Sequence, residues 1–216
     1  YLTDAVGGPR GFGFVFDEAG DDLHVADGPT PSVYGTANVH AALSQGIGFG
    51  YRKYAAGGIG LLCDLAGDDV YQAGEFSQGG GYYHSLGVLR DYEGNDVYRG
   101  NRYAQGFGVH QAFGVLLEDG GDDMYSAMTA ADQGSAWDIA AGALVERGGN
   151  DSYAAGGMAQ ASAAQQAIAY LIECAGDDTY QTIRPGQGGS GSNTYHWDGT
   201  RAFSFSLLND RAGDDT

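Results

Sequence analysis

Gly-Asn-Asp-Val-Tyr at residues 94–98, Gly-Gly-Asp-Asp-Met-Tyr at 120–125 and Gly-Gly-Asn-Asp-Ser-Tyr at 148–153 are three copies of one motif. The same Gly-(Asp/Asn)-Asp turn recurs along the whole 216-residue chain. Its spacing is 27 or 28 residues, apart from a first step of 47 and a last step of 37. A fixed period of this length is the signature of a protein built from stacked repeats. The final Asp of the motif occurs at Asp22, Asp69, Asp96, Asp123, Asp151, Asp178 and Asp215.

Four further positions of the unit keep the same register. An acidic residue precedes each of these Asp residues by five positions, a Leu or Val precedes that acid by two, and a Gly, Ala or Ser lies two positions earlier. A Gln follows the Asp after nine or ten residues in the regular units. Agreement at so many positions over seven units is not chance. The apolar position holds Val15, Leu62, Leu89, Leu116, Leu144, Leu171 and Leu208.

The unit predicts strands rather than helices. Helical repeats such as ankyrin and tetratricopeptide units run to about 33–34 residues, and helices tolerate Gly-rich breaks poorly. Short strand-like runs lie between Gly turns here, for example at 59–63 and 107–110. A strand rises ~3.3 Å per residue, so one unit suffices for a coil with three short sides, and coils stack at ~4.8 Å. We therefore predict an all-β fold, a parallel β-helix (β-solenoid) of about seven 27-residue coils.

We expect one solenoid domain over residues 1–216 with two loop insertions. The long steps place the insertions near 26–56, mainly in Ala26–Ser44, and at 188–202. Insertions in solenoids form loops on one face that often bind partners. Between them, residues 57–183 should form five consecutive coils with parallel strands in register. One inward column should contain Leu62, Leu89, Leu116, Leu144 and Leu171.

The strand that carries this Leu has two unusual faces. Alternate positions along the strand differ in residue type. One parity, meaning every second position, holds small residues such as Gly58 and Gly60, and the other parity holds apolar residues such as Ile59 and Leu61. Continuous apolar runs in a parallel sheet indicate that both faces are covered. Either the core is thin, with sheets lying close over Gly and Ala, or one face packs on another molecule.

The acidic turns concentrate the charge, because they hold 19 of the 28 Asp and Glu residues. Stacked coils bring these carboxylates to ~4.8 Å, where two like charges repel by ~3 kcal/mol at an effective dielectric near 20. Ca²⁺, which takes 6–8 oxygen ligands, would relieve this repulsion. The alternative is that the Asp side chains cap their own turns as Asx-turns. The candidate Ca²⁺ ligands are Asp17, Asp21, Asp22, Asp64, Asp68, Asp69, Asp91, Asp96, Glu118, Asp122, Asp123, Glu146, Asp151, Glu173, Asp177, Asp178, Asp210, Asp214 and Asp215.

The three motifs quoted at the start resemble the Gly-Gly-x-Gly-(Asn/Asp)-Asp-x-apolar repeats of RTX calcium-binding β-rolls. The resemblance covers about six residues in each unit. It implies a secreted, calcium-loaded parallel solenoid whose ions lie between the Gly-Asp turns of adjacent coils. The period differs, since RTX motifs recur every nine residues, two per coil, whereas this chain has one motif per 27 residues.

Two uncharged columns accompany the acids. The Tyr after each Asp is predicted to stack as an aromatic ladder, as identical side chains do in stacked parallel strands. A sugar-binding strip is the functional alternative for these rings. The recurrent Gln is predicted to form a ladder of amide hydrogen bonds. The Tyr column contains Tyr71, Tyr98, Tyr125, Tyr153 and Tyr180, with His24 at this position in the first unit.

Composition and charge exclude several function classes. The net charge of −18 argues against nucleic acid and anionic membrane surfaces, which bind basic footprints. No run of 18 apolar residues occurs that would span a membrane as a helix. The sequence shows no nucleophile–base signature that would indicate an enzyme. We expect a calcium-stabilised structural or adhesive protein, extracellular or at the cell surface, that self-associates into an oligomer or filament.

The alternative function is a carbohydrate-active or glycan-binding β-helix. An enzyme of that kind needs a unique polar cluster that breaks the repeat. Arg52 and Lys53, near the first insertion, are the best candidates for such a cluster. No acid pair is marked out as theirs.

Overall fold

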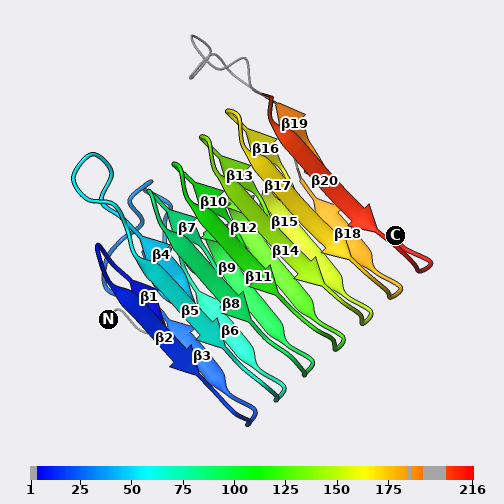
Figure 1. The fold of residues 1–216 in the computed structure, drawn as a ribbon. Coiled ribbons are helices and arrows are strands. Elements are labelled where there is room, and N and C mark those ends of the chain that lie inside the picture. The colour runs from blue at the N-terminus through cyan, green and yellow to red at the C-terminus, as the bar shows by residue number, and fades with distance from the viewer. Residues whose placement is uncertain (1–3, 184–185, 192–202) are drawn as a thin grey trace.

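The computed structural model describes residues 4–183, 186–191 and 203–216. Every strand in this part of the chain belongs to one of three parallel sheets, and each coil contributes one strand to each sheet in turn, except the last, whose described strands lie in two sheets only (Figure 1). The first sheet, sheet A, contains β1 (Val6–Gly7), β4 (Ile47–Phe49), β7 (Gly81–Tyr82), β10 (Gly108–Val109), β13 (Ala136–Trp137), β16 (Ala163–Ala164) and β19 (Ser190–Gly191).

The other two sheets carry the longer strands. Sheet B contains β2 (Phe12–Phe16), β5 (Ile59–Cys63), β8 (Leu86–Arg90), β11 (Phe113–Leu117), β14 (Ala141–Glu146), β17 (Ile168–Glu173) and β20 (Phe205–Asp210). Sheet C contains β3 (Leu23–Ala26), β6 (Val70–Ala73), β9 (Val97–Ala104), β12 (Met124–Asp132), β15 (Ser152–Gly157) and β18 (Thr179–Thr182). The predicted all-β parallel solenoid is confirmed: five regular coils lie between the insertions, which interrupt the first and last coils.

The predicted register is also confirmed. In sheet B the recurrent Leu residues pair with one another from coil to coil, and all five from Leu62 to Leu171 have 0% exposure. In sheet C the Tyr residues pair in the same way. The two columns belong to one core cluster that also packs against Val15 and Leu208 near the two ends of the described chain. The Leu column and the Tyr column therefore form the core.

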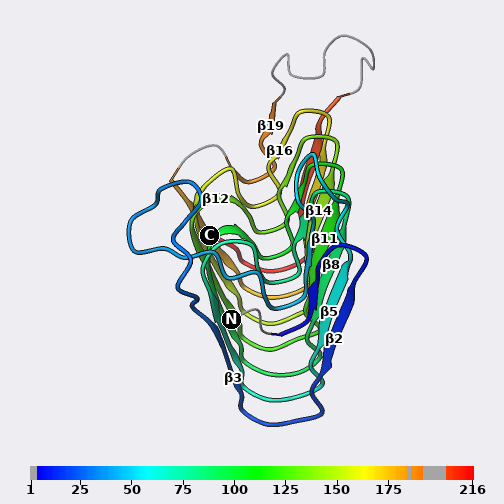
Figure 2. The same ribbon diagram turned by 90° about the vertical axis from the view of Figure 1, so that its left-hand side faces the viewer.

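Sheets B and C form two walls that converge on the acidic turns, as the view along the solenoid shows (Figure 2). Sheet A lies against sheet B, and the small residues of sheet B make this approach possible. A Cβ atom on Gly87 would lie 1.8 Å from the carbonyl oxygen of Gly80, and one on Gly114 would lie 1.9 Å from that of Phe107. On the small parity the structure bears out the first of the two alternatives, a thin core in which sheets lie close over Gly.

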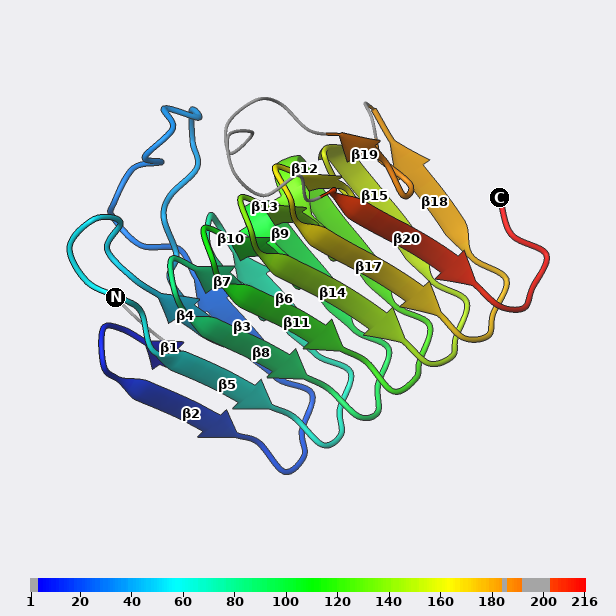
Figure 3. The same ribbon diagram turned by 45° about the horizontal axis from the view of Figure 1, so that its top comes forward.

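The apolar parity of sheet B is only partly buried within the chain, since Val115 is 9% exposed whereas the strand starts are open to solvent. Ile59, Phe113 and Ile168 are each more than 40% exposed, and Phe14 is 51% exposed. These side chains point away from the core along the outer face of sheet B, whose strands lie side by side in Figure 3. No further layer of the described residues lies over this face, so the chain itself does not cover it, and packing of this face on another molecule stays a prediction.

The insertions lie outside the regular coils. The first follows β3 and folds back on itself through an antiparallel bridge between Pro31 and His40. A short second loop follows β4 and is closed by a bridge from Tyr51 to Ala55. Of the insertion at 188–202, residues 192–202 lie outside the described part. Among the described residues, no helix is long and apolar enough to cross a membrane.

Candidate metal centre

The acidic turn connects each strand of sheet B to the following strand of sheet C, and it sends its two Asp positions to opposite sides. The last Asp of the motif is buried in the regular coils, with 1% exposure at Asp96 and 2% at Asp123. The middle position is exposed, as at Asp68 and Asp122. Consecutive residues of an extended chain point in opposite directions. The turn therefore builds two separate rows, one inside the solenoid and one outside.

The outer row caps the turns of neighbouring coils. The backbone N–H of Asn95 donates to Asp68 Oδ1 at 2.8 Å, and the N–H of Asp122 donates to Asn95 Oδ1 at 3.0 Å. Asn95 and Asn150 also donate through their side-chain amides to the preceding Asp, each at 3.0 Å. Because Asn alternates with Asp over positions 68, 95, 122, 150 and 177, no two carboxylates are adjacent in this stretch of the row.

The inner row bonds in the opposite sense along the solenoid. Asp96 Oδ1 accepts the backbone N–H of Asp69 at 2.7 Å, and Asp123 Oδ1 accepts that of Asp96 at 2.6 Å. The same bond recurs in the other coils. The second carboxylate oxygen of these residues is buried and has no hydrogen-bond partner. Such an unpartnered Oδ2 atom is found on Asp69, Asp96, Asp123, Asp151 and Asp178.

The first acid of each turn lies beside this row. Glu118 Oε1 accepts the backbone N–H groups of Asp119 and Gly120, so this acid caps its own turn. Its other oxygen, Oε2, accepts the phenol O–H of Tyr98 from the preceding coil at 2.7 Å. The same phenol bond recurs in the other regular coils. Self-capping of the turn thus applies to the first acid, whereas the last Asp caps the turn of a neighbouring coil.

The two inner positions come together as triplets of buried carboxylates from two adjacent coils. In each triplet one oxygen per residue lies within 4.8 Å of an oxygen of each other member. Two oxygens bound to one Ca²⁺ at ~2.4 Å can be at most ~4.8 Å apart, so each triplet meets the distance limit for sharing one ion and could supply three of its 6–8 ligands. The fully buried groups include Asp64–Asp69–Asp91, Asp91–Asp96–Glu118, Asp123–Glu146–Asp151 and Asp151–Glu173–Asp178.

Burial makes these carboxylates strong proton acceptors when no cation is bound. Removal from water, reinforced by the Asp91 carboxylate, raises the pKa of Asp96 to about 8. Removal from water, with the charges of Asp123 and Asp91, raises the pKa of Glu118 to about 10. The same causes raise the pKa of Asp151 to about 8. The row must therefore hold protons or metal cations at neutral pH, because a bare line of buried charges is too costly.

The aromatic ladder is confirmed, and its position settles one question about ligands. Successive rings from Tyr71 to Tyr180 stack at 4.8–5.0 Å with interplanar angles of 2–4°. Tyr71, Tyr98, Tyr125 and Tyr153 have 0% exposure. A sugar cannot reach these rings, so the interpretation of the ladder as a glycan-binding strip is wrong.

The predicted ladder of Gln amides is also wrong. Gln105 has a positive φ of 57°, and its amide donates to the carbonyls of Tyr98 and Ser126 in sheet C at 3.1 and 3.0 Å. The amide thus ties two coils together through their backbones.

Arg52 and Lys53 lie in the exposed loop after β4.

The structure divides the 19 predicted ligands into distinct sets. The four fully buried triplets named above unite ten of them, from Asp64 to Asp178. The middle acids Asp21, Asp68, Asp122, Asp177 and Asp214 belong to the exposed outer row. Asp17 forms a group with His24 and Asp64. Alternation along the turn was the signal that separates the inner from the outer acids.

The remaining acids lie in the first and last turns. Asp22 is only half-buried, and it donates its backbone N–H to Asp69 in the inner row. Asp210 accepts the phenol of Tyr180, and exposed Asp215 accepts the N–H of Asp178. These end positions repeat the inner pattern with more exposure to solvent.

The chain was compared with family models, curated proteins and solved structures, and none of them matches it.

Proposed function

We propose that this chain is a structural repeat module whose solenoid is held together by Ca²⁺ ions in its buried carboxylate triplets. The observation that supports this proposal is the row of buried Oδ2 atoms without hydrogen-bond partners, one per regular coil. Native structures leave few such atoms, and each one indicates a missing partner. Each of these Asp residues lies in a group whose members come from two adjacent coils, so one ion would join two coils.

The donor set favours a hard cation over a soft one. Every ligand atom in the fully buried triplets is a carboxylate oxygen, and Ca²⁺ prefers such ligands. The neighbouring phenols of Tyr98 and Tyr125 point their O–H groups at the same carboxylates. Protons compete with the ion, since the pKa of Asp91 is raised to about 7, chiefly by burial. Binding of Ca²⁺ would therefore release protons and strengthen as the pH rises.

Thermal unfolding at pH 7.5, with 5 mM Ca²⁺ or with excess chelator, tests the proposal. Ca²⁺ should raise the melting temperature by many degrees, because a ligand that binds only the folded state stabilises it by mass action. Asp96→Asn, which keeps the Oδ1 acceptor and removes the charge, should reduce this rise. Asp122→Asn in the outer row is the matched control and should keep it. Equal melting temperatures with Ca²⁺ and with chelator would refute the proposal.

We extend the proposal to a structural or adhesive role outside the cell, with self-association as the means of assembly. Two arguments support the extracellular location. The acidic turns resemble RTX calcium-binding repeats, and extracellular modules bind Ca²⁺ with dissociation constants up to about 10⁻³ M. The exposed apolar face of sheet B supports self-association, since large apolar patches mark interaction sites.

A further inference from the structure

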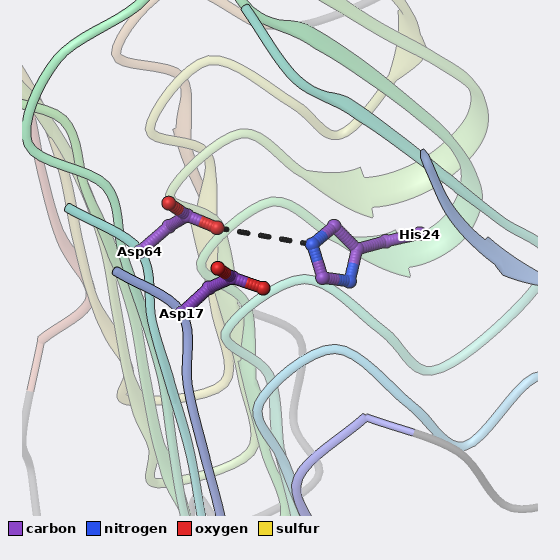
Figure 4. Close-up of side chains that lie close together, drawn as sticks. All are labelled: Asp17, His24 and Asp64. Carbon is purple, nitrogen blue, oxygen red and sulfur yellow. Dashed lines mark ion pairs between the residues drawn. The ribbon is translucent and has the colours of Figure 1, made fainter. Parts of the chain in front are cut away.

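The first coil replaces the repeat Tyr with a histidine. His24 lies at the end of the aromatic ladder, 4.9 Å from the ring of Tyr71 and inclined to it by 8°. The ring faces Asp64, the first acid of the next coil, and Asp17, the first acid of its own coil (Figure 4). One imidazole nitrogen thus takes the place that a phenol O–H occupies in the other coils. This substitution changes a donor into a metal ligand.

The geometry of this cluster is close to that of a small metal site. His24 Nε2 lies 3.8 Å from Asp64 Oδ2, and these atoms and an oxygen of Asp17 lie within 4.8 Å of one another. Tetrahedral bonds of ~2.1 Å place neighbouring ligand atoms ~3.4 Å apart. A contraction of ~0.4 Å between the imidazole and the Asp64 carboxylate would therefore bring them to one ion.

Two buried atoms aimed into the cluster have no hydrogen-bond partner. These atoms are Nε2 of His24 and Oδ2 of Asp64. Asp64 is 1% exposed, so water does not satisfy its oxygen. A neutral imidazole nitrogen and a carboxylate oxygen are both acceptors and cannot satisfy each other without a proton or a metal ion.

The far side of the ring is also arranged as in metal sites. His24 Nδ1 lies 3.7 Å from Asp4 Oδ2. This distance is that of an ion pair and is longer than a hydrogen bond, so Asp4 favours a proton on Nδ1 through its charge and leaves Nε2 to face the cluster. The flat contact with Tyr71 fixes the plane of the ring. His24 is thus oriented by two neighbours toward Asp17 and Asp64.

We propose that His24, Asp17 and Asp64 form a site for a borderline divalent transition metal, with Zn²⁺ as the representative ion. Imidazole nitrogen suits Zn²⁺ and its neighbours in the first transition series, whereas Ca²⁺ takes oxygen ligands. Three protein ligands leave one position for water. Asp4 is a positioning residue in this site. The inference differs from the Ca²⁺ proposal in its imidazole ligand, although Asp64 also belongs to the first buried carboxylate triplet.

Titration of the whole chain with Co²⁺ as a spectroscopic probe, and with Zn²⁺ by calorimetry, tests the site in 5 mM Ca²⁺. We expect one tight equivalent with the visible absorption of tetrahedral Co²⁺. His24→Tyr is the matched variant, because Tyr occupies this position in the next coils and its phenol can donate to Asp64 as Tyr71 donates to Asp91. This variant should keep the fold and its response to Ca²⁺, and should lose the tight equivalent. Asp4→Asn should weaken binding about 10–100-fold.

Three results would overturn the assignment. They are absence of a tight equivalent in the wild-type chain, an unchanged Co²⁺ spectrum in His24→Tyr, and an unchanged affinity in Asp17→Asn. Asp17→Asn also serves as the second variant if His24→Tyr does not fold. If the wild-type chain shows no Ca²⁺-dependent shift in melting temperature but still binds Co²⁺, the result contradicts the proposed function and leaves the His24 site in place.

Discussion

At the scale of single residues, the phenol of Tyr125 shows how the core combines stacking with hydrogen bonding. Its ring stacks on Tyr98 and Tyr153 at 4.8 and 4.9 Å, and its O–H donates to Glu146 Oε2 at 2.7 Å. Tyr125→Phe keeps the stack and leaves a buried carboxylate oxygen without a donor. We expect a loss of about 1–3 kcal/mol in the free energy of unfolding, measured by urea denaturation.

Tyr170→Phe is the control for this change. Tyr170 lies half-buried on the outer face of sheet B, where its ring contacts Phe205 at 5.9 Å. Phenylalanine preserves that contact, so the free energy of unfolding should change by less than about 0.5 kcal/mol. A similar loss in both variants would show that the buried phenol–carboxylate bond contributes nothing special.

At the scale of elements, the acidic turns link stability to pH. Burial and neighbouring charges raise the pKa values of Asp96 and Glu118 in the folded chain to about 8 and about 10, compared with about 4 in an unfolded chain. The folded state therefore binds more protons between these limits, and its stability falls as the pH rises. In chelator, the melting temperature should decrease from pH 5 to pH 9.

Calcium should oppose this dependence, because the ion replaces the protons on the same carboxylates. With 5 mM Ca²⁺ the melting temperature should fall less over the same range or rise. Melting curves at one-unit pH intervals in both buffers provide the measurement. A melting temperature that rises with pH in chelator would contradict the raised pKa values.

At the scale of the whole molecule, the outer face of sheet B is an apolar surface on a strongly acidic protein. From the strand spacing and rise, this face measures about 29 Å by 16 Å. Its large side chains, such as Phe14 and Phe113, are about half exposed. These dimensions give an area of roughly 460 Å², somewhat over half of the ~800 Å² per partner of a standard interface. The acids gather at the turns along one edge. Pairing of two copies with their strands antiparallel would keep those edges apart.

Phe113→Glu tests this surface. Phe113 lies on the central strand of sheet B with 43% exposure, so a charge there should cost little folding stability and should prevent face-to-face packing. Light scattering over a range of concentrations should show association of the wild-type chain and its loss in the variant. Met128→Glu, on sheet C with 61% exposure, is the charge-matched control. Equal masses for the wild type and Phe113→Glu would rule out this face as the contact.

The repeat register explains which features could be predicted. The Leu column and the Tyr ladder follow from equal spacing, since residues at one position of a coil must stack. The division of Asp68 from Asp69 depends on the backbone of the turn, and the amide contacts of Gln105 depend on a left-handed φ of 57° that its sequence does not announce. The exposure of Ile59 was not predicted either, because a continuous apolar run does not show whether a further layer covers the face opposite the Leu column.

The two rows of turn hydrogen bonds make each coil interchangeable with its neighbours. In the inner row, the N–H of one coil meets the carboxylate of the following coil, and in the outer row it meets that of the preceding coil. Both surfaces of a regular coil therefore carry the same donors and acceptors at the same places. Excision of one whole unit, residues 97–123, joins Asp96 to Met124 and leaves the turn hydrogen bonds of the remaining coils with equivalent partners.

Such a shortened chain should keep its β-sheet circular dichroism per residue and unfold cooperatively, whereas removal of residues 97–110 should destroy the fold by deleting only part of a coil. Retained structure in the second deletion, or its loss in the first, would contradict this modularity. Gene duplication could lengthen the protein in the same way, by about 4.8 Å for each added unit. The length of the solenoid is then set by the number of its units, which evolution or an engineer can change.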